Sequence, residues 1–184
     1  MNQDFLFYAL IGVIVAATLG YLNKKASTHT QPKQDGWYLL RMHRLYNFMG
    51  YLGILLGIVV GIGPVLTDEA DLAMYITIFL AFLIFMGLGI LSVLFYRNHY
   101  LRFNDTDIEV SNAYGKITRT SWDNIIDGRF NISSGLITLT DSDGVKLKIH
   151  QHLTGLGGFV GLMEQKTKIK AKDIGLPVKA KNLS

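Results

Sequence analysis

The chain has 184 residues, a net charge of +4 and no cysteine, and 49% of its residues are hydrophobic. The absence of cysteine excludes disulfides, thiolate-bound metals and cysteine nucleophiles. The mean hydropathy of +0.28 is high for a soluble domain, and the apolar excess lies before Tyr96. The Lys and Arg residues gather beside apolar runs and near the C-terminus, so we expect anionic lipid headgroups, and no nucleic acid, as their counter-charge.

Three uncharged apolar runs predict transmembrane helices at about residues 5–22, 45–66 and 74–96. Each run is close to the roughly 20 residues that a helix needs to cross about 30 Å of hydrocarbon. A signal peptide is the rival interpretation of the first run, but Asp4 precedes it and no small-x-small cleavage site follows it. Residues 1–96 are therefore predicted to form a transmembrane region whose second and third spans make an antiparallel hairpin.

Basic residues predict the orientation of these spans, because loops rich in Lys and Arg stay in the cytoplasm. The N-terminal tail and the turn at residues 67–73 contain neither residue type. The segments that follow the first and third spans contain Lys24, Lys25, Lys33, Arg41, Arg44, Arg97 and Arg102. We therefore expect the N-terminus outside and the C-terminal half in the cytoplasm.

Small residues recur every fourth position in two of the predicted spans, and this spacing places them on one helix face. They are Gly12, Ala16 and Gly20 in the first span and Gly53, Gly57 and Gly61 in the second. Either these two spans pack together, or one of the grooves receives a partner; a third alternative is that glycine is simply frequent in membrane helices. The three spans hold no Asp, Glu, Lys, Arg or His, which argues against a self-contained pump or transporter.

After Tyr96 the pattern changes to short alternating segments separated by turn residues, which predicts a strand meander. The expected strands are residues 100–103, 107–111, 116–121, 129–133, 136–140 and 145–150. Residues 154–169 then show a helical pattern, with Leu156, Phe159, Val160 and Met163 on its apolar face. The second half is therefore predicted to be an α+β domain over residues 97–170.

The hairpin followed by this meander resembles the bacterial membrane-anchored pleckstrin-homology-like (PH-like) family over residues 45–170. The resemblance is carried by Gly115-Lys116 before a strand, Ser121-Trp122-Asp123-Asn124-Ile125, a D-x-D-G hairpin and a closing Leu-rich helix. It implies a bacterial plasma (inner) membrane protein whose domain is a partly open β-barrel capped by the C-terminal helix. Trp122 would be an anchor in the core or at the rim of that barrel.

PH-like folds are best known for binding phosphoinositides through basic residues of the first hairpin. Here that turn is identified as Asn104-Asp105-Thr106-Asp107, whose acidic side chains would repel a phosphate. We therefore expect no phosphoinositide recognition at this turn.

Lysines crowd the C-terminus, and residues 171–184 are predicted to be a basic tail. The six lysines are Lys166, Lys168, Lys170, Lys172, Lys179 and Lys181. A polybasic segment near the inner leaflet gains on the order of 1 kcal/mol per residue from anionic lipid. Contact with the membrane surface and a solvated, frayed tail are both open.

Other polar clusters do not assemble into a catalytic, cofactor or metal site. The pairs His150 with His152 and His43 with His99 lack further ligands, so surface and interfacial positions are expected. The run from Asp141 to Gly144 lacks the spacing of a calcium loop and is predicted to be a turn. No nucleophile motif, phosphate loop or zinc motif occurs, so no enzyme activity and no cofactor are expected.

Two functional hypotheses remain. The first is a non-enzymatic scaffold or accessory subunit whose spans join an assembly of other membrane-protein subunits or copies of itself, and whose PH-like domain docks a protein partner. The second is a membrane protein that handles a lipid or small molecule where the basic run at residues 41–44 meets the one at residues 97–99. Positive-inside anchoring already accounts for these charges.

Overall fold

A computed structural model describes residues 36–62 and 71–181 and divides them into two compact units. One unit contains residues 42–62, 71–99 and 111–116 and is built on two long helices. The other contains residues 36–41, 100–110 and 117–181 and is built on β-strands and a short helix. The predicted first span at residues 5–22, with Gly12, Ala16 and Gly20, lies outside the described residues.

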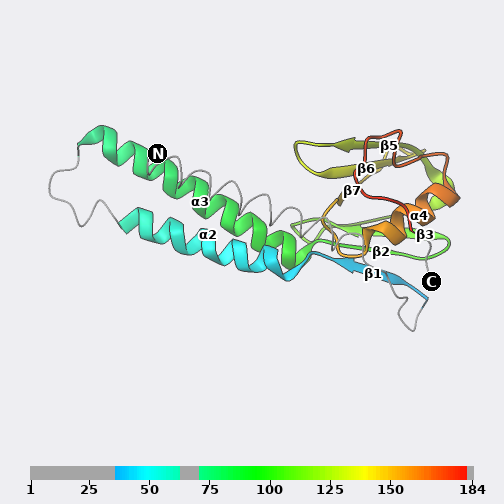
Figure 1. The fold of residues 1–184 in the computed structure, drawn as a ribbon, viewed down its shortest axis with the longest axis horizontal. Helices are drawn as coiled ribbons and strands as arrows, with labels where there is room; N and C mark the ends of the chain where they lie inside the picture. The colour runs from blue at the N-terminus through cyan, green and yellow to red at the C-terminus, as the bar shows by residue number, and fades with distance from the viewer. Residues whose placement is uncertain (1–35, 63–70, 182–184) are drawn as a thin grey trace, which may run out of the picture. The chain divides into compact units, whose positions relative to one another are not determined.

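The helical unit contains α2 (Arg44–Ile62) and α3 (Leu72–Asn98), which run side by side (Figure 1). The Asp71 carboxylate caps the start of α3 by accepting a hydrogen bond from the Met74 N–H at 2.8 Å. Both helices are long and apolar enough to cross a membrane. Two of the three predicted spans are therefore apolar helices in the described part of the chain.

The first sheet has the strand order β1-β2-β3-β4. Its strands are β1 (Tyr38–Arg41), β2 (Tyr100–Phe103), β3 (Asp107–Ser111) and β4 (Ile117–Ser121). The antiparallel pair β1 and β2 places Tyr38 opposite Phe103 and Arg41 opposite Tyr100. The helical hairpin is thus inserted between the first two strands of the sheet.

Strand β1 was not predicted, because residues 23–44 were interpreted as a basic loop. It is only four residues long, and the whole of α2 and α3 separates it from its partner in the sequence. A strand this short is recognised through its pairing, and that pairing is non-local. The sheet domain therefore begins before the hairpin, not at residue 97.

The second sheet has the order β5-β6-β7 and is antiparallel throughout. Its strands are β5 (Ile125–Asn131), β6 (Leu136–Asp141) and β7 (Lys146–His150). The 3₁₀ turn η2 (Trp122–Asn124) leads directly into β5, so this strand starts earlier than the predicted residue 129. The described strand pairings give an α+β fold with two antiparallel sheets and do not include closure into the predicted barrel.

Helix α4 (Leu156–Lys166) follows the second sheet and is almost entirely buried. Its predicted apolar face, which includes Phe159 and Met163, lies in the core. Two glycines of α4 contact the chain near Lys181. The Lys181 N–H donates to the Gly157 carbonyl at 2.9 Å. A Cβ at Gly161 would collide with the Lys181 carbonyl oxygen. Residues 171–181 are thus folded onto α4, unlike the frayed tail that was one sequence-based alternative.

Candidate functional site

Glycines of α2 bring its backbone against α3. A Cβ built at Gly53 would lie 3.1 Å from the Gly89 Cα, and one at Gly57 would lie 3.2 Å from the Met86 nitrogen. Gly61, the third predicted member of this face, meets a phenylalanine ring of α3. The groove predicted to receive the first span or a partner is therefore occupied by the third predicted span, because close backbone approach requires small residues on facing helices.

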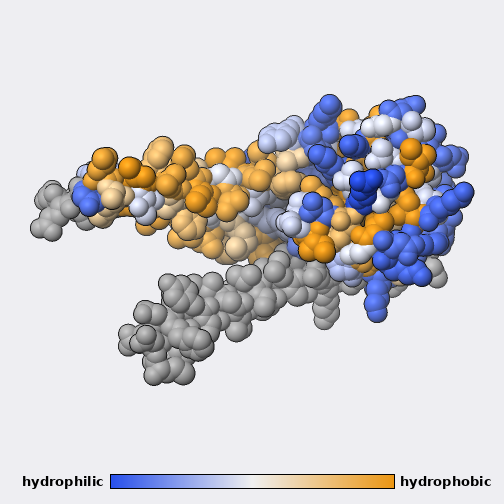
Figure 2. All heavy atoms as spheres, turned by 90° about the horizontal axis from the view of Figure 1, so that it is seen from above, coloured by the Kyte–Doolittle hydropathy of each residue, from blue (hydrophilic) through white to orange (hydrophobic). Residues whose placement is uncertain are grey.

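The remaining surface of this glycine-packed hairpin is apolar and exposed (Figure 2). Large exposed side chains include Phe48, Leu55, Val59, Phe79, Ile84 and Leu88. A helix that is hydrophobic all round is suited to a buried or lipid environment and not to water. Small residues inside and large apolar residues outside form an arrangement suited to lipid contact.

Polar and aromatic residues mark one end of the hairpin. Arg44 opens α2 and Arg97 lies in the last turn of α3, where its guanidinium donates to the Tyr51 hydroxyl at 3.1 Å. Tyrosine and basic side chains at a helix end are typical of the membrane–water interface.

The side chains of residues 97–99, one of the two basic runs of the lipid-handling alternative, make contacts within the protein. Arg97 is bonded to Tyr51, and the next two side chains contact the turn between β3 and β4. Asn98 Nδ2 donates to the Ala113 carbonyl at 2.7 Å, and His99 Nδ1 lies 2.6 Å from the Ser111 carbonyl oxygen. Burial lowers the pKa of His99, although the contact with Ser111 acts in the opposite direction.

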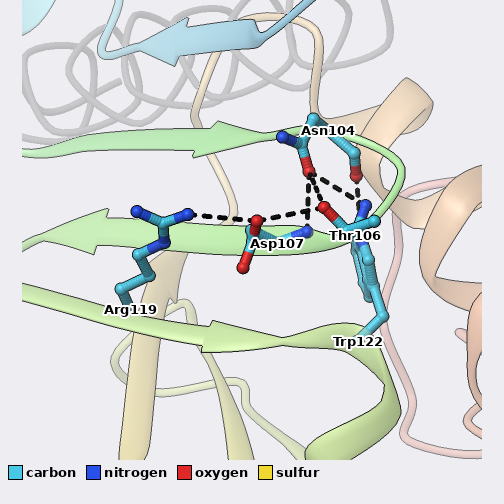
Figure 3. Close-up of polar contacts among 5 residues, drawn as sticks. All are labelled: Asn104, Thr106, Asp107, Arg119 and Trp122. Atoms are coloured by element: carbon cyan, nitrogen blue, oxygen red, sulfur yellow. Dashed lines mark hydrogen bonds and ion pairs between the residues drawn. The ribbon is translucent and has the colours of Figure 1, made fainter.

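Trp122 is a core residue of the sheet unit, with 1% of its surface exposed. Its ring packs against Phe103 and Phe159, and its indole N–H donates to the Asn104 carbonyl at 2.8 Å (Figure 3). The hydrogen bond satisfies the one polar group of the buried indole. Trp122 therefore connects η2 to β2 and α4 through ring contacts, and to the turn after β2 through a hydrogen bond.

The acidic turn at residues 104–107 joins β2 to β3 (Figure 3). The Asn104 side-chain oxygen accepts from the Thr106 and Asp107 N–H groups, and Asp107 forms an ion pair with Arg119 at 3.1 Å. The hydrogen bond from Arg119 lowers the pKa of the Asp107 carboxyl. This turn was predicted to be the first connection of the sheet, but it is the second, because the helical hairpin connects β1 to β2.

A cleft of about 700 Å³ lies on the β5-β6-β7 sheet and was missed by the sequence analysis. Its lining includes Asp127, Arg129, Asn131, Ile132, Thr138 and Lys146. Arg129 and Asp127 form an ion pair at 3.1 Å, and Ile132 is 82% exposed. The polar residues at alternate positions of these strands indicate a solvent-facing side. Nothing in their pattern indicates that the strands assemble into a cleft.

The C-terminal lysines mostly project into solvent although their backbone is folded. Lys166, Lys168, Lys172 and Lys179 are exposed, and Lys170 is exposed while donating to the Glu164 carbonyl at 2.8 Å. The tail backbone is held by Ala171, Leu176 and Val178, which are buried, and by the contact of Lys181 with α4.

The remaining polar clusters are small. The His150 and His152 rings lie 5.1 Å apart, and burial lowers the pKa of His152. Asp141 is buried and accepts from Thr120, Asp143 and Val145, so it organises the turn that the sequence predicts. Over residues 36–62 and 71–181, no three His, Asp or Glu side chains are placed to hold a metal ion together.

Comparison with known proteins does not identify a relative of this chain. No family model matches the sequence, and no curated protein or solved structure matches it. Its function is therefore inferred from the hairpin and from the surfaces of the sheet unit.

Proposed function

We propose that this chain is a membrane-anchored, non-enzymatic interaction module, a scaffold or accessory subunit of a bacterial inner-membrane assembly. Its hairpin spans the membrane, with the N-terminus outside and the sheet unit in the cytoplasm. The proposal rests on where small and large residues lie on the hairpin. Gly53, Gly57 and Gly89 are used between α2 and α3, which leaves the outward faces apolar and exposed. Such a surface is stable in hydrocarbon and costly in water.

The sheet unit supplies the docking surface of the module. Four plus three antiparallel strands followed by a buried helix agree with the PH-like architecture that the sequence resembles. The cleft on the second sheet combines a highly exposed isoleucine with both signs of charge, from Asp127, Arg129 and Lys146. An apolar anchor within a polar rim is the usual composition of a protein-binding patch. The partner is a membrane-protein subunit or a second copy of the chain.

The exposed lysines support a further contact with the inner leaflet. Lys166, Lys168, Lys170, Lys172 and Lys179 all project from the segment that follows the core of α4. Their attraction to anionic lipid is expected to weaken with salt, because charges are screened within about 8 Å at physiological ionic strength.

The test is co-purification of the full chain from native membranes in mild detergent. Ile132→Asp should remove a specific co-purifying protein or the second copy, whereas Ile117→Asp on β4, where the isoleucine is 55% exposed, should not. Both variants should fold, since neither side chain is buried. Retention of lipid without any protein partner would instead support the lipid-handling alternative.

A further inference from the structure

The turn between β3 and β4, Ser111–Lys116, belongs to the compact unit formed by α2 and α3. The side chains of Asn98 and His99 hold this turn through the carbonyl oxygens of Ala113 and Ser111, at 2.7 and 2.6 Å. Ala113 is 5% exposed. The turn is therefore fixed to the end of α3, through its last residue Asn98 and through His99.

Hydrogen bonds within the turn hold its backbone, and the turn displays an aromatic side chain. The Asn112 side-chain oxygen accepts from the N–H groups of Tyr114 and Lys116 at 2.9 and 3.0 Å. Gly115 adopts a φ of +81°, which favours glycine, and its N–H donates to the Asn112 carbonyl. Tyr114 is nevertheless 78% exposed. These hydrogen bonds hold a large amphipathic ring away from the protein core.

The position of the turn along the hairpin determines what surrounds this ring. The uncharged run of α3 ends at Arg97, and Tyr51 of α2 contacts Arg97 at the same level. If the hairpin spans a bilayer, this level is where the hydrocarbon meets the headgroups, and tyrosine and basic side chains are enriched there. Tyr114 and the exposed Lys116 extend this belt beyond the two helices.

We propose that the β3–β4 turn is an interfacial membrane anchor in which the Tyr114 ring inserts among phospholipid headgroups and Lys116 contacts their phosphates. The inference rests on the proposed membrane-spanning hairpin and adds a third point of attachment, at the turn that the end of α3 holds. Its occupant is the headgroup layer of the same bilayer.

The chain contains no cysteine, so single cysteines can carry a nitroxide label at chosen positions of the full protein. Labels at Tyr114→Cys and Lys116→Cys test the turn. Ile132→Cys, at a position 82% exposed, is the aqueous control, and Phe79→Cys, at a position 59% exposed on α3, is the lipid control. The measurement is collision of each label with oxygen and with a water-soluble nickel chelate, in liposomes of phosphatidylcholine and phosphatidylglycerol.

We expect both turn labels to collide with the nickel chelate several-fold less than the Ile132 label, and the Phe79 label least of all. Turn labels as accessible as the Ile132 label, with the Phe79 label protected, would overturn the anchor and leave the hairpin standing. Accessibility of the Phe79 label as well would overturn both proposals. Protection of the turn in native membranes but not in liposomes would also overturn the anchor, because a protein would then cover Tyr114.

Discussion

At the scale of single residues, Trp122 and His152 are buried rings of the sheet unit that each carry a polar group. Trp122 packs on Phe103 and Phe159 while its indole nitrogen reaches the Asn104 carbonyl. His152, which is 7% exposed, is buried next to His150. Removing the Trp122 ring should weaken the fold, and so should protonating the His152 ring.

Trp122→Ala should lower the free energy of unfolding by about 3–5 kcal/mol, because it leaves a cavity between two aromatic rings. Denaturant titration of the full chain in detergent, followed by near-ultraviolet circular dichroism, measures this loss. Ile132→Ala is the matched control at an 82% exposed position and should change stability by less than about 0.5 kcal/mol. Equal effects of the two substitutions would contradict the anchoring role of Trp122.

Acidification should destabilise the sheet unit through His152. Burial lowers the pKa of His152 below its ordinary value of 6.5, so the unfolded chain binds the proton more readily than the folded one. The contribution of His152 to stability should be fully present above the pKa of 6.5 that the residue has in the unfolded chain. It should be lost as the pH falls through 6.5 towards the lower pKa of the folded protein. Unfolding of wild type and His152→Gln between about pH 7.5 and about pH 5 measures this; the variant should show a smaller loss. If wild type and His152→Gln lost the same stability on acidification, His152 would not be the group responsible.

At the scale of elements, the close packing of α2 on α3 depends on glycines of both helices. A Cβ at Gly89 would lie 2.7 Å from the Ile54 nitrogen and 2.8 Å from the Gly50 carbonyl oxygen. These atoms belong to a helix backbone and cannot move aside without separating the helices. Gly87, two residues earlier on α3, has nothing within 4 Å of its Cβ position.

Gly89→Ala should therefore destabilise the hairpin, by about the 1–3 kcal/mol typical of overpacking. Gly87→Ala is a matched control on the same helix, and it should have no steric cost. The midpoint temperature of unfolding in mild detergent compares the two variants with wild type. An equal loss of stability in the Gly87 variant would contradict the packing explanation, because Ala favours a helix more than Gly does and the Cβ position of Gly87 is open.

At the scale of the whole molecule, the helical hairpin is inserted between β1 and β2. Both of its ends therefore continue into strands of one sheet. If the hairpin spans the membrane, the two helices cross it in opposite directions, so the chain between them is expected on the side opposite to β1 and β2.

A cysteine at residue 70 should react with an impermeant maleimide added to intact cells, and a cysteine at residue 184 should react only after the membrane is opened. The expected orientation follows from the basic residues beside the sheet end of the hairpin, including Arg44 and Arg97, and from the acidic connection. Labelling of residue 184 in intact cells would place the domain outside and exclude a cytoplasmic partner.

The sequence by itself determined the two apolar helices, most strand positions and the amphipathic face of α4, because each is a local periodicity of hydrophobic residues. Only the tertiary structure decided which surfaces meet. In it, β1 pairs with β2 although the whole hairpin separates them in the sequence, and the helix face with Gly53 and Gly57 packs on α3. Lys181 contacts Gly157, and the turn with Tyr114 is held by the end of α3. Each of these contacts joins residues far apart in the chain. The glycine spacing predicted a close helix contact. It could not predict which helix makes that contact, because small residues allow any helix to approach and the choice depends on long-range packing.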